Sequence, residues 1–120
     1  MNIGETGRNG ETRVAAFLRK SGYKIVKRNY QCRYGEIDII AEKDEYIVFV
    51  EVKTRKKNSL ISPLEAVDGF KKQRIIYTAQ DYMMKTDCSL QPRFDVAEVF
   101  TEQSIDKKIK YSLNYIKNAF

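Results

Sequence analysis

Three charged residues at the end of a predicted β-hairpin have the types and the spacing of a catalytic or metal-binding site: Asp38, Glu51 and Lys53. Side chains alternate between the faces of a strand, so Glu51 and Lys53 continue the inward-facing row of the second strand beyond Phe49. By the same alternation Asp38 shares a face of the first strand with Ile40, and antiparallel pairing can bring that face next to Glu51. Two carboxylates and an ammonium are therefore expected to converge at one end of a buried hairpin.

Burying these charges is costly unless they pair with one another or bind a cation, and both arrangements are open. In the first, Lys53 forms an ordinary ion pair with a carboxylate at the edge of the sheet and has no chemical role. In the second, Asp38 and Glu51 supply hard oxygen ligands to Mg²⁺ or Mn²⁺, and Lys53 lies beside the ion.

The spacing of these residues resembles a nuclease signature. Gly35–Asp38, followed by Glu51–Lys53, resembles the divergent PD-(D/E)xK pattern, with the two acids and the lysine at its three matching positions. More narrowly, GEIDIIA and FVEVKTR are similar to sequences of the small bacterial YraN-like family, which is assigned by fold to that nuclease superfamily. The chain departs from the name motif in having Ile37 rather than proline before Asp38.

This resemblance implies metal-assisted hydrolysis of DNA phosphodiester bonds, with Mg²⁺ or Mn²⁺ as the cofactor. Asp38 and Glu51 would hold one or two ions, and the Val52 carbonyl is a further candidate ligand. Lys53 would orient the nucleophile or neutralise the phosphate. Superfamily relatives include junction resolvases, which act as dimers, so branched DNA and a homodimer are also expected.

The elements that must position these residues begin with the hairpin itself. Its strands are predicted at Ile37–Ala41 and Tyr46–Val52, two runs rich in Ile, Val, Phe and Tyr that are separated by the polar residues 42–45. The second strand is apolar on both faces, which is typical of a sheet covered by helices on both sides. Both strands are therefore expected to be central.

A helix before the hairpin carries a further carboxylate on its core side. It is predicted from Glu5 or Arg8 to Lys20, and Glu11 falls on its apolar stripe. A glutamate there is either a first-turn residue favoured by the helix dipole or part of the site. The resemblance of Asn9–Glu11 to a GxxGE-like helix of the family favours an auxiliary metal-site role for Glu11, through a water molecule. The apolar stripe consists of Val14, Ala15, Phe17 and Leu18.

The remaining elements complete an α/β (α+β) architecture. A second helix is predicted to start at Ser62, and Gly69 is a point at which it can divide. The strand after it, Arg93–Thr101, is expected to lie parallel to the second hairpin strand through a right-handed crossover. The order resembles the αβββαβ core of restriction endonuclease-like proteins, a mixed central sheet flanked by helices, in a single domain over residues 1–120. Other expected features are an early strand at Tyr23–Tyr30, an edge strand at Lys108–Leu113 and a stripe of Phe70, Ile75, Ala79, Tyr82 and Met83 in the second helix.

Basic residues lie next to the proposed metal ligands. Arg55, Lys56 and Lys57 belong to the densest positive cluster of the chain. They form either a solvated loop or a rim that binds backbone phosphates, and their position directly after the ligands favours the rim. Lys71 and Arg74 match by position a lysine and an arginine of the YraN-like pattern, which implies contact with the substrate backbone.

Two other predictions concern residues outside this group. Asp95 belongs to a segment that resembles the family's RFDVV-like sequence, and an ion pair with Arg93 is its ordinary explanation. Tyr30 and Tyr34 can stack on nucleic-acid bases, yet with eight tyrosines in the chain some must lie near any site.

Composition narrows the class of protein. A length of 120 residues suits one domain, and a formal net charge of +6 at pH 7 favours an anionic partner such as nucleic acid. The lack of histidine excludes Ser-His-Asp and Cys-His catalysis. Cys32 and Cys88 have no CxxC spacing for a zinc site, so they are expected to be reduced thiols of a cytoplasmic protein. No apolar run has the length of a membrane span, and no membrane partner is expected.

Two further functions stay open on these residues. A module that keeps the nuclease fold can bind nucleic acid without cleaving it, and an assembly factor can dock on ribonucleoprotein through its basic surface. Dependence on a divalent metal separates the nuclease from both.

Overall fold

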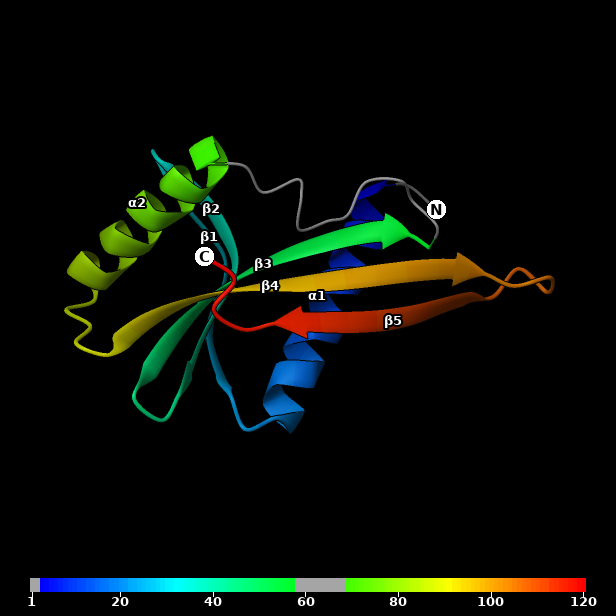
Figure 1. Ribbon diagram of the computed structural model, residues 1–120, viewed down its shortest axis with the longest axis horizontal. Helices are drawn as coiled ribbons and strands as arrows, with labels where there is room; N and C mark the ends of the chain where they lie inside the picture. The colour runs from blue at the N-terminus through cyan, green and yellow to red at the C-terminus, as the bar shows by residue number, and fades with distance from the viewer. Residues whose placement is uncertain (1–2, 58–68) are drawn as a thin grey trace.

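A five-stranded mixed sheet carries one helix on each face in the described part of the chain (Figure 1). The computed structural model describes residues 3–57 and 69–120, with side chains from residue 9 onward. Neither α1 nor α2 combines the length and the hydropathy that a membrane span requires. In chain order the elements are α1 (Ile3–Lys20), β1 (Lys24–Cys32), β2 (Gly35–Lys43), β3 (Tyr46–Lys56), α2 (Gly69–Lys85), β4 (Gln91–Gln103) and β5 (Ile109–Ile116).

The strands lie in the order β1-β2-β3-β4-β5. β1, β2 and β3 are antiparallel neighbours, β3 and β4 are parallel, and β5 returns antiparallel along β4. A tight turn cannot join parallel strands, and the connection between β3 and β4 contains α2. The predicted αβββαβ core, with a parallel fourth strand and an edge strand beyond it, is confirmed.

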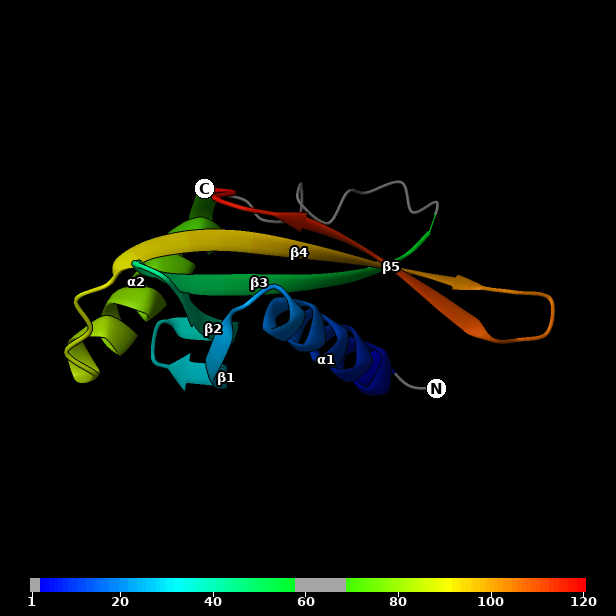
Figure 2. The ribbon, with the colours of Figure 1, turned by 90° about the horizontal axis from the view of Figure 1, so that it is seen from below.

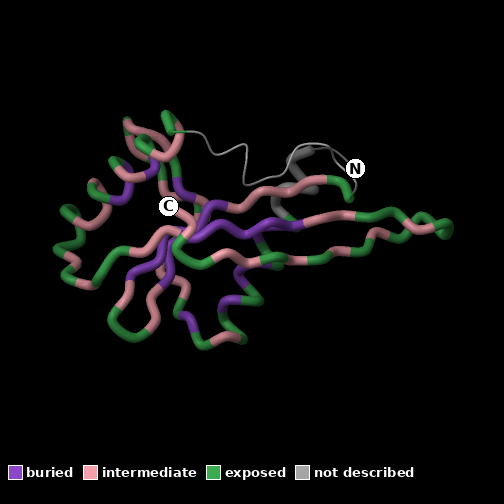
Figure 3. Tube along the Cα trace, viewed as in Figure 1, coloured by how far each residue is buried: buried purple, intermediate pink, exposed green. Residues whose placement is uncertain are grey.

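The sheet separates two hydrophobic clusters because its central strands are apolar on both faces. Figure 2 shows α1 lying along one side of β3 and β4. In β3, Val48 and Val50 pack in the cluster that includes α1. Ile47 and Phe49 pack in the cluster that includes α2. Figure 3 shows buried residues gathered along the middle of the sheet. The prediction that the hairpin strands are central is therefore confirmed.

The hairpin strands are longer than predicted. β2 continues through Lys43, which pairs with Tyr46, so the turn consists of Asp44 and Glu45. Asp44 has a left-handed backbone with a φ of 54°, which aspartate tolerates in tight hairpin turns. Polar composition had suggested residues 42–45 as the connection. The backbone of Glu42 and Lys43 nevertheless pairs with β3, although their side chains are polar and only half-buried.

β3 also extends further than predicted. Its pairing with β4 continues to Lys56 opposite Thr101, so Arg55 and Lys56 lie on a strand. The amide of Lys57 then donates a hydrogen bond to the Thr101 carbonyl at 2.7 Å. The loop interpretation of the basic cluster is therefore wrong through Lys56, because β4 supplies hydrogen-bond partners to a segment whose charged side chains do not suggest a strand.

α1 packs as its apolar stripe predicts, with one exception. Val14, Ala15 and Leu18 are fully buried. Phe17 is 38% exposed and packs instead on Tyr115 of β5, with ring centroids 5.4 Å apart. It therefore lies at the boundary between α1 and the edge of the sheet rather than in the core.

α2 begins at Gly69, where the sequence suggested a division. The predicted N-cap Ser62 lies outside the described residues. Of the predicted stripe, Ile75 and Ala79 are buried, whereas Phe70 is 75% exposed. Phe70 was wrongly predicted as core, because helical periodicity cannot tell a residue that packs on the sheet from one that lines a cleft beside it.

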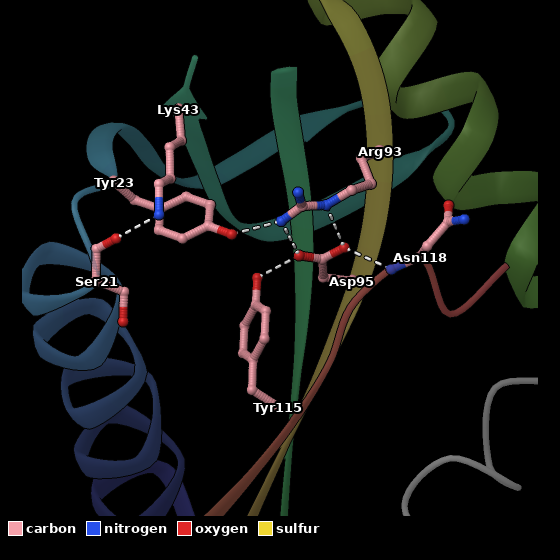
Figure 4. A network of polar contacts seen from close by, with 7 residues as sticks. All are labelled: Ser21, Tyr23, Lys43, Arg93, Asp95, Tyr115 and Asn118. Carbon is pink, nitrogen blue, oxygen red and sulfur yellow. Dashed lines mark hydrogen bonds and ion pairs between the residues drawn. The ribbon is translucent and has the colours of Figure 1, made fainter. Parts of the chain in front are cut away.

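A buried polar network attaches the segment after β5 to β4 (Figure 4). Asp95 is fully buried and accepts hydrogen bonds from the Arg93 guanidinium, the Tyr115 hydroxyl and the backbone amide of Asn118. Arg93 also donates to the Tyr23 hydroxyl at 2.6 Å. The predicted ion pair between Asp95 and Arg93 is present at 2.8 Å.

Candidate active site

The strands of the central hairpin separate at Asp38. Their pairing ends with Ile39 opposite Val50. Beyond that point a side chain bridges the gap, because the Val52 amide donates a hydrogen bond to Asp38 Oδ2 at 2.7 Å. The carboxylate of Asp38 is thereby held between β2 and β3.

Side-chain alternation in β2 is interrupted around Asp38. Ile37 and Ile40 both pack on the α2 side of the sheet, whereas Ile39 and Ala41 pack on the α1 side. Strict alternation would put Ile37 and Ile40 on opposite faces. Simple alternation therefore does not hold through Asp38, which lies where the two strands diverge and lines the same cleft as Glu51.

Glu51 brings a second carboxylate to this fork. It follows Phe49 on the α2 side of β3 and is 8% exposed. Burial raises the pKa of Asp38 to about 8, and the hydrogen bond and negative charge of Glu51 add to the rise. The Val52 amide and the Lys53 ammonium act in the opposite direction. Asp38 therefore keeps a proton at neutral pH when no cation is bound.

Two lysines lie beside the acids. Lys71 Nζ, from α2, is 3.9 Å from Glu51 Oε2. Burial lowers the pKa of Lys53, and the neighbouring Lys71 ammonium lowers it further, whereas the charge of Glu51 raises it. Two carboxylates and two amines are thus packed together, and the pKa values of Asp38 and Lys53 respond to these neighbours.

These side chains line a cleft of about 640 Å³ between the hairpin and the start of α2. Arg74 lines it as well, and Arg74 Nε donates a hydrogen bond to the Tyr34 carbonyl at 3.0 Å. The predicted substrate-backbone residues Lys71 and Arg74 therefore lie at the same cleft as Asp38 and Glu51. Folding brings them there from a different element, because α2 packs against β2.

The other predicted phosphate-binding residues lie further along β3. Arg55 is half-buried and donates from Nη1 to the Thr54 carbonyl at 3.3 Å. Lys56 is exposed, and Lys57 forms an exposed ion pair with Glu102 at 3.3 Å. They are not among the described residues that line the cleft, so their phosphate-binding role stays a prediction.

Glu11 is buried on the α1 side, where its position on the helix stripe placed it. It pairs with Arg28 of β1, whose Nε lies 3.1 Å from Glu11 Oε1. Burial raises the pKa of Glu11, the Arg28 hydrogen bond opposes that rise, and the negative charge of Asp38 adds to it. Glu11 is therefore within electrostatic reach of Asp38, and its auxiliary metal-site role stays a prediction.

Some residues that line the cleft were missed by the sequence reasoning. Gln31 and Glu36 are register partners in β1 and β2, and Gln31 Nε2 donates to Glu36 Oε2 at 2.9 Å. A signal for them existed in the short turn at Arg33 and Tyr34, because a tight hairpin places its flanking residues side by side. Phe70 had no such signal.

The donor set at the fork suits Mg²⁺ or Mn²⁺. No group of three or more acidic, cysteine or histidine side chains able to hold a metal occurs within residues 3–57 and 69–120. Mg²⁺ is commonly bound by one or two carboxylates and completes its octahedron with waters and substrate phosphates. Asp38 and Glu51 supply that number of carboxylates, and the Val52 backbone lies in the same wall. Burial, together with the neighbouring Glu51, raises the pKa of Asp38, and a cation would favour its ionised form.

The fold and the cleft together define a mixed α+β protein with an αβββαβ core and a cluster of acids and amines where its central hairpin opens. The chain belongs to the Uncharacterised protein family UPF0102, whose family model matches residues 10–99. That match includes every described residue lining the cleft. The YraN-like resemblance inferred from the motifs is thereby confirmed.

Relatives of this family align over nearly the whole chain. A UPF0102 protein of Caldanaerobacter subterraneus is 43% identical over 121 residues, covering 100% of this chain and 98% of the relative. One from Caldicellulosiruptor bescii is 45% identical over 123 residues and is covered completely, as is this chain. A relative from Clostridium perfringens is 48% identical over 112 residues, covering 92% of this chain and 89% of the relative.

Proposed function

We propose that the protein is a metal-dependent nuclease that hydrolyses DNA phosphodiester bonds, with branched or junction DNA as its first candidate substrate. One observation carries the proposal. Asp38 and Glu51 lie together at the wall of a cleft whose other charged residues include Lys53, Lys71 and Arg74. A cation and a phosphate can therefore be accommodated side by side, the cation on the acids and the phosphate on the basic residues.

The residues of the fork have separate tasks in this reaction. Asp38 and Glu51 hold the divalent ion, and the hydrogen bond from the Val52 amide keeps the Asp38 carboxylate in place. When bound, the ion supplies Lewis-acid chemistry, which acidifies a water molecule and offsets charge on the phosphate. Lys53, whose pKa is lowered by burial, orients the attacking water or neutralises the phosphate as charge develops.

Binding of the strand falls to residues around the fork. Lys71 and Arg74 reach the cleft from α2 and neutralise phosphates next to the one that is cut. Arg55, Lys56 and Lys57 extend the positive surface along and just beyond β3. A homodimer would place two such clefts on the arms of one junction, so a second copy belongs to this proposal.

The test is a cleavage assay on labelled linear, single-stranded, flapped and four-way-junction DNA, with Mg²⁺, Mn²⁺ or EDTA. Cutting is expected with either metal and not with EDTA. Asp38→Ala and Lys53→Ala are each expected to lower the cleavage rate by at least 100-fold. Asp38 would hold the ion, and Lys53 would neutralise the charge that develops on the phosphate in the transition state. Glu36→Ala, which removes an exposed acid from the rim, serves as the matched control and should retain most activity. Equal cutting by wild type and both variants would remove the catalytic proposal.

A second function, a nucleic-acid-binding module that does not cleave, is favoured by the position of Lys71. Its ammonium lies 3.9 Å from Glu51, where it can replace a metal ion as the balancing charge. Under this alternative the wild type binds DNA without cutting it, and Glu51→Ala binds at least as tightly because a negative charge has been removed. Metal-dependent cutting in the same assay excludes the alternative.

A further inference from the structure

A second hollow, of about 650 Å³, lies next to the cleft between the β1–β2 turn and the outer face of α2. Cys32 lines both cavities. A second link is Arg74, which lines the cleft while its Nε donates to the carbonyl of Tyr34, a residue that lines the hollow. The two cavities are therefore adjoining parts of one surface, and a ligand held in the cleft can extend into the hollow.

Aromatic rings form a wall of this hollow. The rings of Tyr34 and Tyr77 have centroids 5.7 Å apart and planes tilted by 51°. Tyr77 is 45% exposed, and neither ring belongs to the two hydrophobic clusters of the fold. The Arg33 guanidinium lies 4.8 Å from the Tyr34 ring centroid, and Arg33 Nη2 is 2.6 Å from the Tyr34 hydroxyl. These contacts hold the Tyr34 ring in place beside a Tyr77 ring that is open to solvent.

Charged and polar groups surround the rings. Arg33 and Lys85 supply positive charge, and the Lys85 ammonium lies 3.0 Å from Asp81. Asp81 is itself fixed by the Tyr30 hydroxyl at 2.5 Å. Gln80, the residue before Asp81 in α2, is exposed, and its side-chain amide can both donate and accept hydrogen bonds. An aromatic surface flanked by cations and an amide has the chemistry that holds a nucleobase and its phosphate.

We propose that this hollow is a stacking site for an unpaired nucleotide, next to the phosphate held in the cleft. The inference rests on the proposed nuclease function and names its substrate class: a strand with at least one unstacked base beside the cutting site. Bases inside a continuous duplex have their faces covered by their neighbours, so such a duplex cannot use Tyr77. Flaps, junctions and single strands expose the base faces that stacking requires.

The test measures binding without cleavage, in EDTA, by fluorescence anisotropy. The probes are a fluorescein-labelled single-stranded DNA, the same strand with abasic sites at its centre, and a blunt duplex. The proteins are the wild type, Tyr77→Ala and the matched control Tyr77→Phe, which keeps a ring. Because Tyr77 is exposed, the variants are expected to fold, and circular dichroism melting checks this.

The wild type is expected to bind the base-bearing strand about tenfold more tightly than the abasic strand. Tyr77→Ala should abolish this difference, Tyr77→Phe should keep it, and duplex binding should be the same in all three proteins. A Tyr77→Ala protein that still distinguishes the two strands as the wild type does would overturn the inference. So would a wild type that does not distinguish them.

The proposed function fails separately. Base-dependent binding without metal-dependent cutting would keep the stacking site and remove the nuclease. Metal-dependent cutting without base-dependent binding would keep the nuclease and remove the stacking site.

Discussion

Two aspartates of the sheet differ in what surrounds them. The carboxylate of Asp95 meets a guanidinium, a hydroxyl and a backbone amide, so its charge is balanced and its role is structural (Figure 4). Asp38 has one backbone amide and faces the carboxylate of Glu51. A buried acid beside another acid must keep a proton or take a cation, and this difference makes Asp38 rather than Asp95 the candidate for chemistry.

Asp38→Asn is expected to stabilise the metal-free protein at pH 8 and to change its stability little near pH 4. Folding raises the pKa of Asp38 from 3.8 to about 8. Between these pH values Asp38 therefore keeps a proton in the folded chain that it releases in the unfolded chain. The contribution of Asp38 to stability is therefore complete below about pH 4 and is lost as the pH rises towards 8. Asparagine ends this titration and keeps an oxygen for the Val52 amide. Because stability falls by about 1.4 kcal/mol per pH unit over this range, the gain at pH 8 should be about 5 kcal/mol, measured by urea unfolding in EDTA.

Glu36→Gln is the control for this comparison, because it removes an equal charge from an exposed position of the same strand. The free energy of unfolding of Glu36→Gln should equal that of the wild type at both pH values. If the wild type and Asp38→Asn lose the same stability between the two pH values, Asp38 does not keep a proton in the folded chain.

At the scale of elements, the approach of α1 to β3 depends on Gly10. A Cβ at this position would lie 2.4 Å from Thr54 Oγ1, well inside contact distance. The absence of a side chain lets α1 lie close to the sheet one residue before Glu11. This close approach is how a carboxylate of α1 comes within electrostatic reach of Asp38.

Gly10→Ala is expected to destabilise the protein by about 1–3 kcal/mol through overpacking, although alanine is the better helix former. Thr54→Ala removes the clashing oxygen, so the cost of Gly10→Ala should be smaller in that background. Urea unfolding of the two single variants and the double variant measures this coupling. Gly69→Ala, where an added Cβ meets no atom within 4 Å, is the matched control and should cost little. Strict additivity of the two substitutions would contradict the proposed contact.

At the scale of the whole molecule, the cleft and the buried Asp95 network lie on opposite faces of the sheet, although Asp95 pairs with Val50, the residue before Glu51. The cleft opens where β2 leaves β3, and the network holds the segment after β5 against the beginning of β4. The β4–β5 hairpin projects beyond the helices (Figures 1 and 2). Substitutions in the network are thus expected to change fold stability without removing a residue that lines the cleft.

Asp95→Ala is expected to destabilise the protein by about 3–5 kcal/mol, because it leaves the largely buried Arg93 guanidinium without its carboxylate. Tyr115→Phe removes only one hydrogen bond to Asp95 and should cost about 1 kcal/mol. Both are measured by urea unfolding. Equal, small losses for the two variants would mean that the network contributes little beyond its individual hydrogen bonds.

The elements and their order could be predicted from the sequence because they depend on local patterns. Continuous apolar runs marked β2 and β3, the stripe through Val14 and Leu18 marked α1, and the helix between β3 and β4 implied a parallel pair. Strand ends were less predictable. Lys56 and Lys43 lie on strands because a neighbouring strand supplies hydrogen bonds, and that neighbour is not a local property of either residue.

The sequence by itself determined which residues could do chemistry at this site: two acids and a lysine, with no histidine to offer another mechanism. It also determined the family, because the motifs that carry the resemblance are contiguous. Tertiary structure alone decided that β2 parts from β3 at Asp38, that Lys71 faces Glu51, and that Tyr34 meets Tyr77 beside the cleft. These features join segments distant in the chain, and only the packing of the sheet and its helices selects one such pairing among the many that the same local patterns allow.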